Sequence, residues 1–236
     1  MGAPSLPKID LPIYEMMLPS TKEKIKYRPF TVKEEKILLV AQESGEPEQQ
    51  IVAVKQIVNN CLLDRDVAEF AMFDLEFVML ALRSRSVDNK IPIKIQDEDT
   101  GEKVELELNL EMVELERHDD HTNRVAINET YTLFLKYPTI DEFIKISTSD
   151  PDDPLTSYFV LISCLDKVAS DDEVFDFKDY KQEEVDKFME DISADVVRGI
   201  EKFFETMPAM KYEIPYTLKD GTEKTFKVAG INAFFS

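Results

Sequence analysis

Alternating apolar positions near the N-terminus predict a β-hairpin that leads into a helix. Apolar residues recur at every second position over 14–18 and 25–27, on either side of a turn-prone Pro-Ser-Thr sequence. This period of two is typical of a two-stranded hairpin with one buried face. Thr31 and Glu34 then have the spacing of a capping box, in which each side chain bonds a backbone amide of the first turn. A helix is therefore expected to begin at Thr31.

Two further helical segments and a second hairpin are expected next. Apolar residues recur at helical spacing over 51–62 and again over 75–82, where Asp74 is the expected N-cap. Alternating apolar runs over 91–95 and 104–110 then flank a turn rich in Asp and Gly, which favours a hairpin.

The middle of the chain changes from a polar loop to a strand and a short helix. Residues 111–129 are polar without clear periodicity, so they are interpreted as irregular. Alternation over 131–135 predicts a strand. Thr139 and Glu142 repeat the capping-box spacing, so a second capped helix is expected there.

The last third of the chain predicts helices and a closing hairpin. Apolar residues recur at helical spacing over 155–165, 185–192 and 196–207. The acidic and aromatic run 174–180 between them is expected to be exposed. Alternation over 211–228, interrupted by Asp-Gly, is typical of a β-hairpin.

These elements predict an α+β fold in which helices pack with several short antiparallel hairpins. The proline-rich residues 1–13 are expected to form an extended arm, which either frays or lies on a neighbouring subunit. We expect a first α+β half over 14–129 and a second over 130–236. Both halves would follow a similar order, with helices that carry Cys61 and Cys164, so an internal pseudo-duplication is one interpretation; chance similarity is the other.

The chain is strongly acidic. It has 48 acidic and 28 basic residues, which give a formal net charge of −20. Such a surface repels phosphate backbones, so no contact with nucleic acid is expected, whereas a basic protein partner suits it. No stretch approaches 18 consecutive apolar residues, so no membrane span is expected. The charge also allows an alternative function, an acidic binding protein or nucleic-acid mimic that inhibits a basic host factor.

Candidate chemistry is sparse. The sequence has no G-x-S-x-G motif, no P-loop and no G-x-G-x-x-G, so we expect no enzyme and assign no catalytic or cofactor-binding residues. His118 and His121, the only histidines, flank two aspartates; a solvated loop is favoured over a metal site. Cys61 and Cys164 are interpreted as buried, reduced thiols.

Four segments resemble a known family. Residues 18–21 (LPST), 24–30 (KIKYRPF) and 32–39 (VKEEKILL) are similar to the start of the T-even-type bacteriophage baseplate hub subunit family. Residues 230–235 (GINAFF) resemble its closing motif. The resemblance implies a structural or assembly subunit of a contractile phage tail, with other baseplate or hub proteins as partners. It implies a location in the virion baseplate, after assembly in the host cytoplasm. Relatives often carry paired cysteines in the middle hairpin; none are present here, so zinc is not implied.

Several aromatic and basic residues are expected to contact such partners. Arg83 and Arg85 end a helix, where they either complement its dipole or bind carboxylates of a partner. Phe234 and Phe235 either anchor a partner or pack on the chain's own last hairpin. The interface candidates are Tyr27, Arg28, Phe30, Arg83, Arg85, Ile231, Phe234 and Phe235.

Overall fold

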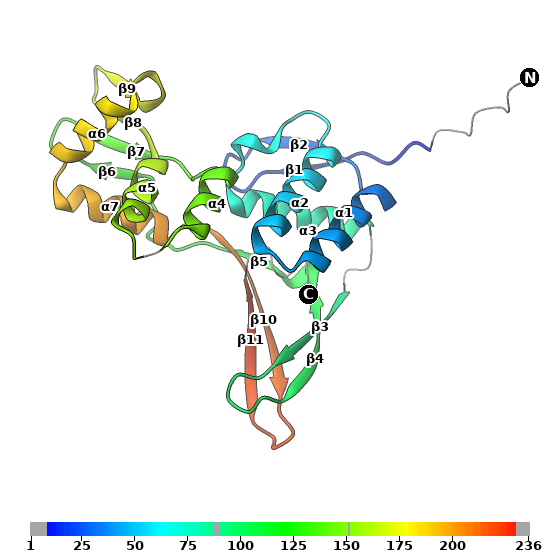
Figure 1. Cartoon of the computed structure of the whole chain (residues 1–236). Coiled ribbons are helices and arrows are strands. Elements are labelled where there is room, and N and C mark those ends of the chain that lie inside the picture. Colours follow the sequence, from blue (N-terminus) through cyan, green and yellow to red (C-terminus); the bar gives the residue numbers. More distant parts are fainter. Residues whose placement is uncertain (1–8, 87–89, 151, 230–236) are drawn as a thin grey trace, which may run out of the picture. The chain divides into compact units, whose positions relative to one another are not determined.

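A computed structural model describes residues 9–86, 90–150 and 152–229 (Figure 1). Helices alternate with short antiparallel strands along these residues, so the expected α+β class is confirmed.

Contacts between residues divide the chain into two compact units. Unit 1 comprises Met1–Val67, Asp74–Val113 and Tyr212–Ser236, and unit 2 comprises Ala68–Phe73 and Glu114–Lys211. This division differs from the two halves expected from the sequence, because the C-terminal hairpin groups with the first half of the chain.

Unit 1 combines two hairpins with three helices and a strand pair near its N-terminus. Its elements are β1 (Tyr14–Met17), β2 (Lys24–Tyr27), α1 (Val32–Ser44), α2 (Pro47–Cys61), α3 (Met72–Ser86, which starts within unit 2), β3 (Lys90–Gln96), β4 (Lys103–Asn109), β10 (Ala209–Thr217, which also starts within unit 2) and β11 (Glu223–Ala229). Short 3₁₀ turns lie at Val67–Glu69, which continues into unit 2, and at Leu110–Met112.

The N-terminal hairpin and the capped helix form as the sequence predicts. Strand β1 pairs antiparallel with β2. Thr31 caps α1 in a capping box with Glu34, and Gly45 ends the helix with φ 68°, a left-handed conformation that glycine adopts without strain. The expected N-cap role of Asp74 is wrong, because α3 begins two residues earlier. Asp74 instead accepts hydrogen bonds from the backbone amide (3.0 Å) and hydroxyl of Ser20.

A cluster of hydrogen bonds explains why the last hairpin belongs to unit 1. The carboxylate of Asp97, in the β3–β4 turn, accepts hydrogen bonds from Tyr216 Oη of β10 (2.7 Å) and Lys224 Nζ of β11 (2.7 and 2.9 Å). Lys224 Nζ also donates to Asp99 (2.7 Å). Hydrogen bonds from Lys224 and Tyr216 hold the pKa of Asp97 well below its usual range. The two hairpins are therefore joined by a charge network that sequence spacing does not reveal.

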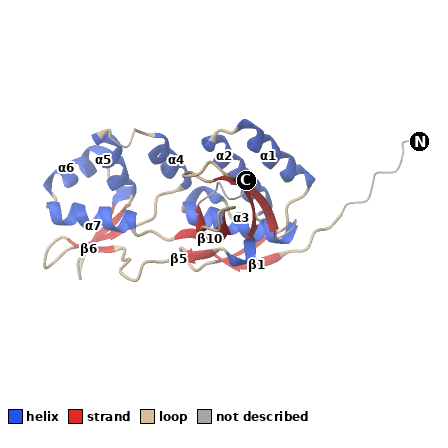
Figure 2. Cartoon of the chain, turned by 90° about the horizontal axis from the view of Figure 1, so that it is seen from below, coloured by secondary structure: helices blue, strands red, loops and turns tan. Residues whose placement is uncertain are grey.

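Unit 2 is a four-stranded antiparallel sheet with helices on one face. The sheet order is β6-β7-β8-β9, and Figure 2 shows α5, α6 and α7 on the same side of it. The elements of unit 2 are β5 (Glu114–Glu116), β6 (Arg124–Ala126), β7 (Thr132–Leu135), α4 (Ile140–Thr148), α5 (Pro154–Ser163), β8 (Leu165–Ala169), β9 (Val174–Asp176), a 3₁₀ turn η3 (Phe177–Asp179), α6 (Gln182–Asp191) and α7 (Ala194–Glu205).

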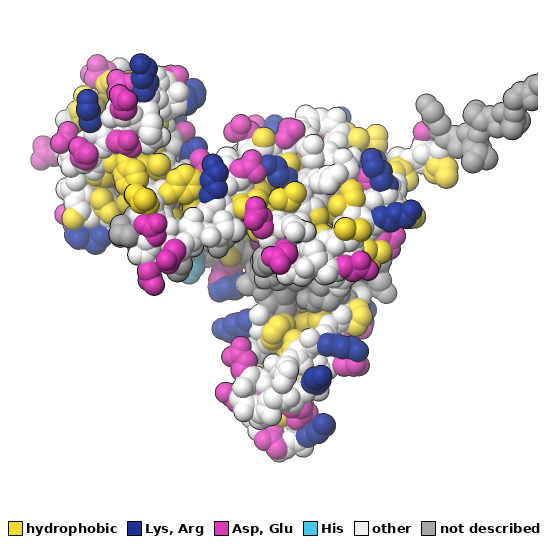
Figure 3. All heavy atoms as spheres, viewed as in Figure 1, with side chains coloured by type: hydrophobic (Ala, Val, Ile, Leu, Met, Phe, Trp, Pro, Cys, Tyr) yellow, Lys and Arg dark blue, Asp and Glu magenta, His cyan; other side chains and the backbone are white. Residues whose placement is uncertain are grey.

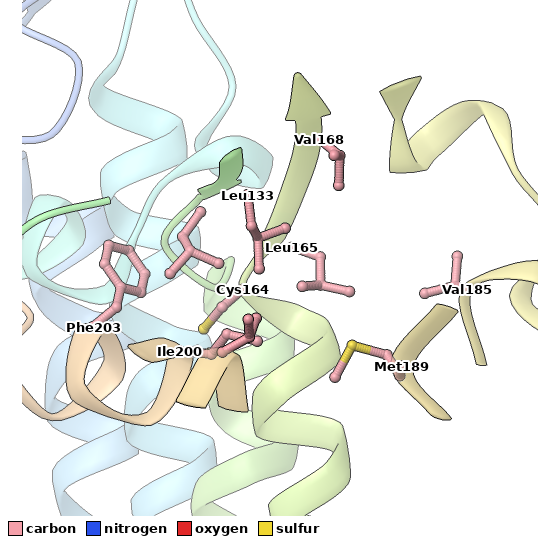
Figure 4. Close-up of a cluster of buried hydrophobic side chains, with 10 residues drawn as sticks. Leu133, Cys164, Leu165, Val168, Val185, Met189, Ile200 and Phe203 are labelled. Carbon is pink, nitrogen blue, oxygen red and sulfur yellow. The ribbon is translucent and has the colours of Figure 1, made fainter. Parts of the chain in front are cut away.

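The core of unit 2 lies between this sheet and the helices. Figure 4 shows Ile200 and Phe203 of α7 and Met189 of α6 turned toward Leu133 and Leu165 of the sheet, and all five are buried. Helix α7 approaches β6 closely at Gly199, where an added Cβ would lie 2.6 Å from a methyl group of Val125. A side chain at residue 199 would therefore push the helix off the sheet.

Two expectations from the sequence are wrong, and one open interpretation finds no support. Residues 111–129 are not irregular throughout, since they contain β5 and β6. Cys164 does not lie in a helix: it is the C-cap of α5, and strand β8 begins at the next residue. Because β8 and β9 separate α5 from α6, the order of elements expected from a pseudo-duplication is not found in the residues that the structure describes.

Candidate interaction surface

An aromatic groove lies on unit 2. It has a volume of about 560 Å³. Its lining residues are mostly apolar and come from the β6–β7 turn, strands β8 and β9, turn η3 and helix α6: Ile127, Asn128, Tyr131, Val168, Phe175, Phe177, Tyr180, Glu184, Val185 and Phe188. We call this feature the aromatic groove.

The rings of the aromatic groove are held by packing between neighbouring elements. Phe177 of η3 meets Phe188 of α6 edge to face, with ring centroids 5.3 Å apart. The ring centroids of Tyr131 and Phe175 are 6.3 Å apart. Turn η3 forms locally because the Asp176 side chain accepts a hydrogen bond from the backbone amide two residues on. The same sequence that forms this turn therefore places two rings at the wall of the groove.

Three polar side chains that line the aromatic groove have hydrogen-bond partners within unit 2. Asn128 Oδ1 accepts hydrogen bonds from the backbone amides of Thr130 (2.9 Å) and Tyr131 (2.8 Å). Tyr131 Oη donates to Glu173 (3.3 Å). Glu184 accepts from the backbone amide of Lys181 (3.2 Å), as part of the N-terminus of α6. The lining therefore offers apolar contact more than hydrogen bonds to a bound molecule.

Carboxylates are concentrated in the segment that forms much of this groove. Residues 171–191, from the β8–β9 turn to the end of α6, contain ten acidic and three basic residues, an excess of seven negative charges out of the chain's net 20. Asp176 pairs with Lys178 (2.6 Å). The exposed Asp171, Asp172 and Glu183 have no ion pair within the described part of the chain. This segment, the acidic rim, therefore carries uncompensated negative charge beside apolar surface.

A second apolar surface lies over α4 and α5. Figure 3 shows hydrophobic side chains gathered there. Leu155 is 72% exposed, and Phe143, Phe159 and Ile162 are half-buried. Lys145 Nζ lies 5.8 Å from the centre of the Phe159 ring, which covers part of this apolar face with a cation.

Three of the predicted interface residues lie in or beside the core of unit 1. Tyr27 and Phe30 are buried. The guanidinium of Arg28 donates to both oxygens of Glu34 (3.2 and 3.5 Å) and to the carbonyl of Asn60 (2.9 Å). Burial alone would raise the pKa of Glu34, but the hydrogen bonds from Arg28 and Thr31 outweigh it and lower this pKa to about 2.

The other candidates differ in exposure. Arg83 is half-buried, and burial lowers its pKa. Arg85 is exposed, and its guanidinium lies 5.1 Å from the centre of the Tyr14 ring. The predicted contacts at 231, 234 and 235 lie outside the described residues. The sequence did not single out the aromatic groove; its available signal was the acidic and aromatic run 174–180, interpreted as exposed.

His121 is part of a side-chain stack in unit 2. Its ring clusters with those of Tyr137 and Phe203, at centroid distances of 5.7 and 5.0 Å, and those two rings are 5.3 Å apart. The ring nitrogens of His121 contact Thr206 Oγ1 and Tyr137 Oη at 2.9 Å. Burial lowers its pKa. No group of three or more His, Cys, Asp or Glu side chains within the described ranges is placed to hold a metal ion.

Both cysteines are buried free thiols, and burial raises the pKa of Cys61 to about 11 and that of Cys164 to about 12. Among the described helices, none combines the length and apolar character needed to cross a membrane.

Fold and surface together define an acidic α+β protein whose most developed surface feature is suited to contacts with other proteins. Comparison with known families is more specific. The family described as T4 bacteriophage base plate protein matches residues 11–236, and the chain belongs to that family. It is therefore a structural protein of a phage baseplate. No curated protein matches the chain, and neither does any solved structure.

Proposed function

We propose that the chain is a structural or assembly subunit of the baseplate hub of a contractile-tailed phage, and that it acts through protein–protein contacts without catalysis. The family match over residues 11–236 carries this proposal. The resemblance of residues 18–39 and 230–235 to hub subunits supports the hub within the baseplate. Its partners are other baseplate or hub proteins, which it meets in the host cytoplasm before the particle is complete.

Surface chemistry of unit 2 supports action by contact. A protein interface combines an apolar centre with a polar or charged border. The aromatic groove and the acidic rim have this combination within one unit. The exposed Arg85 and the apolar face over α4 and α5 offer further places for a neighbour to bind.

A phage that lacks this chain tests the proposal. Electron microscopy of lysates should show baseplates without a complete hub, or free hub precursors, and supplying the chain in trans should restore complete particles. Mass spectrometry of purified mature particles would separate a retained subunit from an assembly factor. Normal baseplates in the absence of the chain would contradict the proposal.

A second candidate function is an acidic inhibitor or nucleic-acid mimic that binds a basic host factor. The excess of negative charge over residues 171–191 favours it. The same deletion separates the two functions: an inhibitor of the host would leave baseplates intact and alter a process of the host instead.

A further inference from the structure

We propose that the aromatic groove of unit 2 binds an extended, basic segment of a partner protein, which inserts one large apolar side chain between flanking lysine or arginine residues. This inference rests on the proposed function, since it describes one of the contacts by which the chain would join its assembly. It specifies the chemistry of the occupant.

Size and lining of the groove fit an inserted side chain. Its volume of about 560 Å³ accommodates an aromatic or branched aliphatic side chain with part of its backbone. Binding energy at interfaces concentrates where such a side chain fills a dry pocket. Phe175 and Tyr180 are 36% and 43% exposed, so part of the apolar lining is still in contact with water.

The acidic rim determines the charge of the occupant. Ten of the 21 residues from 171 to 191 are acidic and three are basic, and Asp171, Asp172 and Glu183 lack an ion pair with described residues. A partner with acidic flanks would be repelled, whereas lysine or arginine flanks would be attracted and would bind faster at low salt. The charge that surrounds the groove therefore selects a basic segment.

The position of β9 indicates that the segment is extended. Strand β9 is an edge of the four-stranded sheet, with β8 as its partner. Phe175 of β9 lines the aromatic groove, while its neighbour Val174 is 65% exposed. A strand edge presents backbone donors and acceptors to an extended peptide. A segment that pairs with β9 would reach the groove with one side chain.

Two other occupants fit less well. A small polar ligand would find Asn128, Tyr131 and Glu184 already engaged in hydrogen bonds. The chain's own C-terminal residues 230–236, from the same or a second copy, supply two phenylalanines but no lysine or arginine, so they do not match the rim. The experiment below distinguishes this tail from a basic segment.

A displayed library of random 12-residue peptides, selected on the full-length chain at low salt, tests the proposal. We expect enriched peptides to share one aromatic or branched aliphatic residue with lysine or arginine on both sides. Their binding should be saturable and should weaken as salt rises. No enrichment, or enrichment of peptides without basic flanks, would overturn the proposal. Competition by a synthetic peptide of sequence GINAFFS would assign the groove to the tail instead.

Variants of the chain localise the binding. Phe175→Ala should weaken the enriched peptides at least tenfold. Leu155→Ala, an apolar truncation at a more exposed position on α5 (72% against 36%), should not. The double change Asp171→Lys and Asp172→Lys should slow association about tenfold. Glu43→Lys with Glu201→Lys makes the same change in net charge at exposed residues that do not line the groove, and it should have little effect.

Folding of each variant is checked by thermal melting. If Phe175→Ala does not fold, Tyr180→Ala at the exposed edge of the groove replaces it. Equal binding to groove and control variants would overturn the proposal. Because peptide binding needs no phage, this result is independent of the deletion experiment: a normal baseplate with a working groove would reject the hub function alone.

Discussion

Two acidic regions of this chain use their carboxylates in different ways. In the hairpins of unit 1, acidic side chains face lysines across the strands, as in Lys94–Glu105 (3.1 Å) and Lys90–Glu107 (2.6 Å), and Asp97 is buried under Lys224. In residues 171–191 of unit 2, acidic side chains outnumber basic ones by ten to three and border apolar surface.

The difference lies in what each carboxylate contacts. Buried carboxylates such as Glu34 and Asp97 each have cationic and hydroxyl partners, which compensate for the loss of water. Exposed pairs between strands contribute little stability but cancel the local field. In the acidic rim, Asp176 with Lys178 is the one ion pair among the described residues, so most of the negative charge there remains available to a partner. Paired charge therefore indicates a structural role, and uncompensated charge beside apolar surface indicates a docking role.

The largest effect is expected from breaking a buried pair in unit 1. Arg28→Ala leaves Glu34 fully buried without its guanidinium partner, and it also removes the hydrogen bond to the carbonyl of Asn60. The loss of one partner of a buried ion pair typically costs about 3–5 kcal/mol. Chemical denaturation of the purified chain should show this loss in the free energy of unfolding.

The control for Arg28 is an arginine in an exposed pair. Arg65 pairs with Glu23 at the surface of unit 1, so Arg65→Ala should leave the free energy of unfolding almost unchanged. Similar losses for the two variants would show that burial does not separate structural from surface pairs in this chain.

The same buried pair predicts how the stability of the fold depends on pH. The pKa of Glu34 is about 2 in the folded chain and near its ordinary value of 4.5 in the unfolded chain. Because the folded pKa is the lower one, this carboxylate stabilises the fold fully above about pH 4.5. Its contribution is lost as the pH falls from 4.5 toward 2.

Glu34→Gln should flatten the slope of the free energy of unfolding against pH in this range. Asp171→Asn, which removes an exposed carboxylate of the acidic rim, should leave the slope as it is in the unchanged chain. An unaltered slope in the Glu34 variant would mean that Arg28 does not hold this carboxylate ionised.

The two capping boxes give a smaller and directly matched effect. Thr31 Oγ1 donates to Glu34 at 2.6 Å in unit 1, and Thr139 Oγ1 donates to Glu142 at 2.9 Å in unit 2. Replacing an N-cap threonine by alanine costs about 1 kcal/mol, within a range of roughly 0.5–2. We expect Thr31→Ala at the upper end, because the Glu34 side chain is fully buried, and Thr139→Ala at the lower end, because that of Glu142 is 26% exposed. Equal losses, measured by denaturation, would contradict this.

Local signals in the sequence predicted much of this fold. The capping boxes at Thr31 and Thr139 and the alternating strands of the hairpins depend on residues close in sequence, and all of them form as expected. Strand β8 was missed because the helical spacing of Leu155, Phe159 and Ile162 in α5 extends to Leu165, which is the first residue of β8. Short strands such as β6 have too few residues to show a period.

The grouping of hairpins and the aromatic groove could not be predicted, because both depend on contacts distant in sequence. Asp97 meets Tyr216 and Lys224 more than a hundred residues away. The groove brings Tyr131 to Phe175 and Phe188, which belong to separate elements. The interface roles assigned from the sequence stay predictions for all the candidates: Tyr27, Arg28, Phe30, Arg83, Arg85, Ile231, Phe234 and Phe235.

The smallest expected effect is a difference between the two units in how fast their cysteines are labelled. Cys61 in unit 1 and Cys164 in unit 2 are buried, with pKa values raised to about 11 and about 12. At pH 8, about one in a thousand Cys61 side chains and one in ten thousand Cys164 side chains would then be thiolates in the folded chain. A thiol reagent should therefore label both cysteines when the structure opens. Mass spectrometry of the labelled peptides follows each unit separately.

Arg28→Ala should accelerate the labelling of Cys61, since the broken pair lies in unit 1, while the labelling rate of Cys164 should stay the same. Equal acceleration of both would show that the units open together, and a bridge between the cysteines in protein kept from air would contradict free thiols.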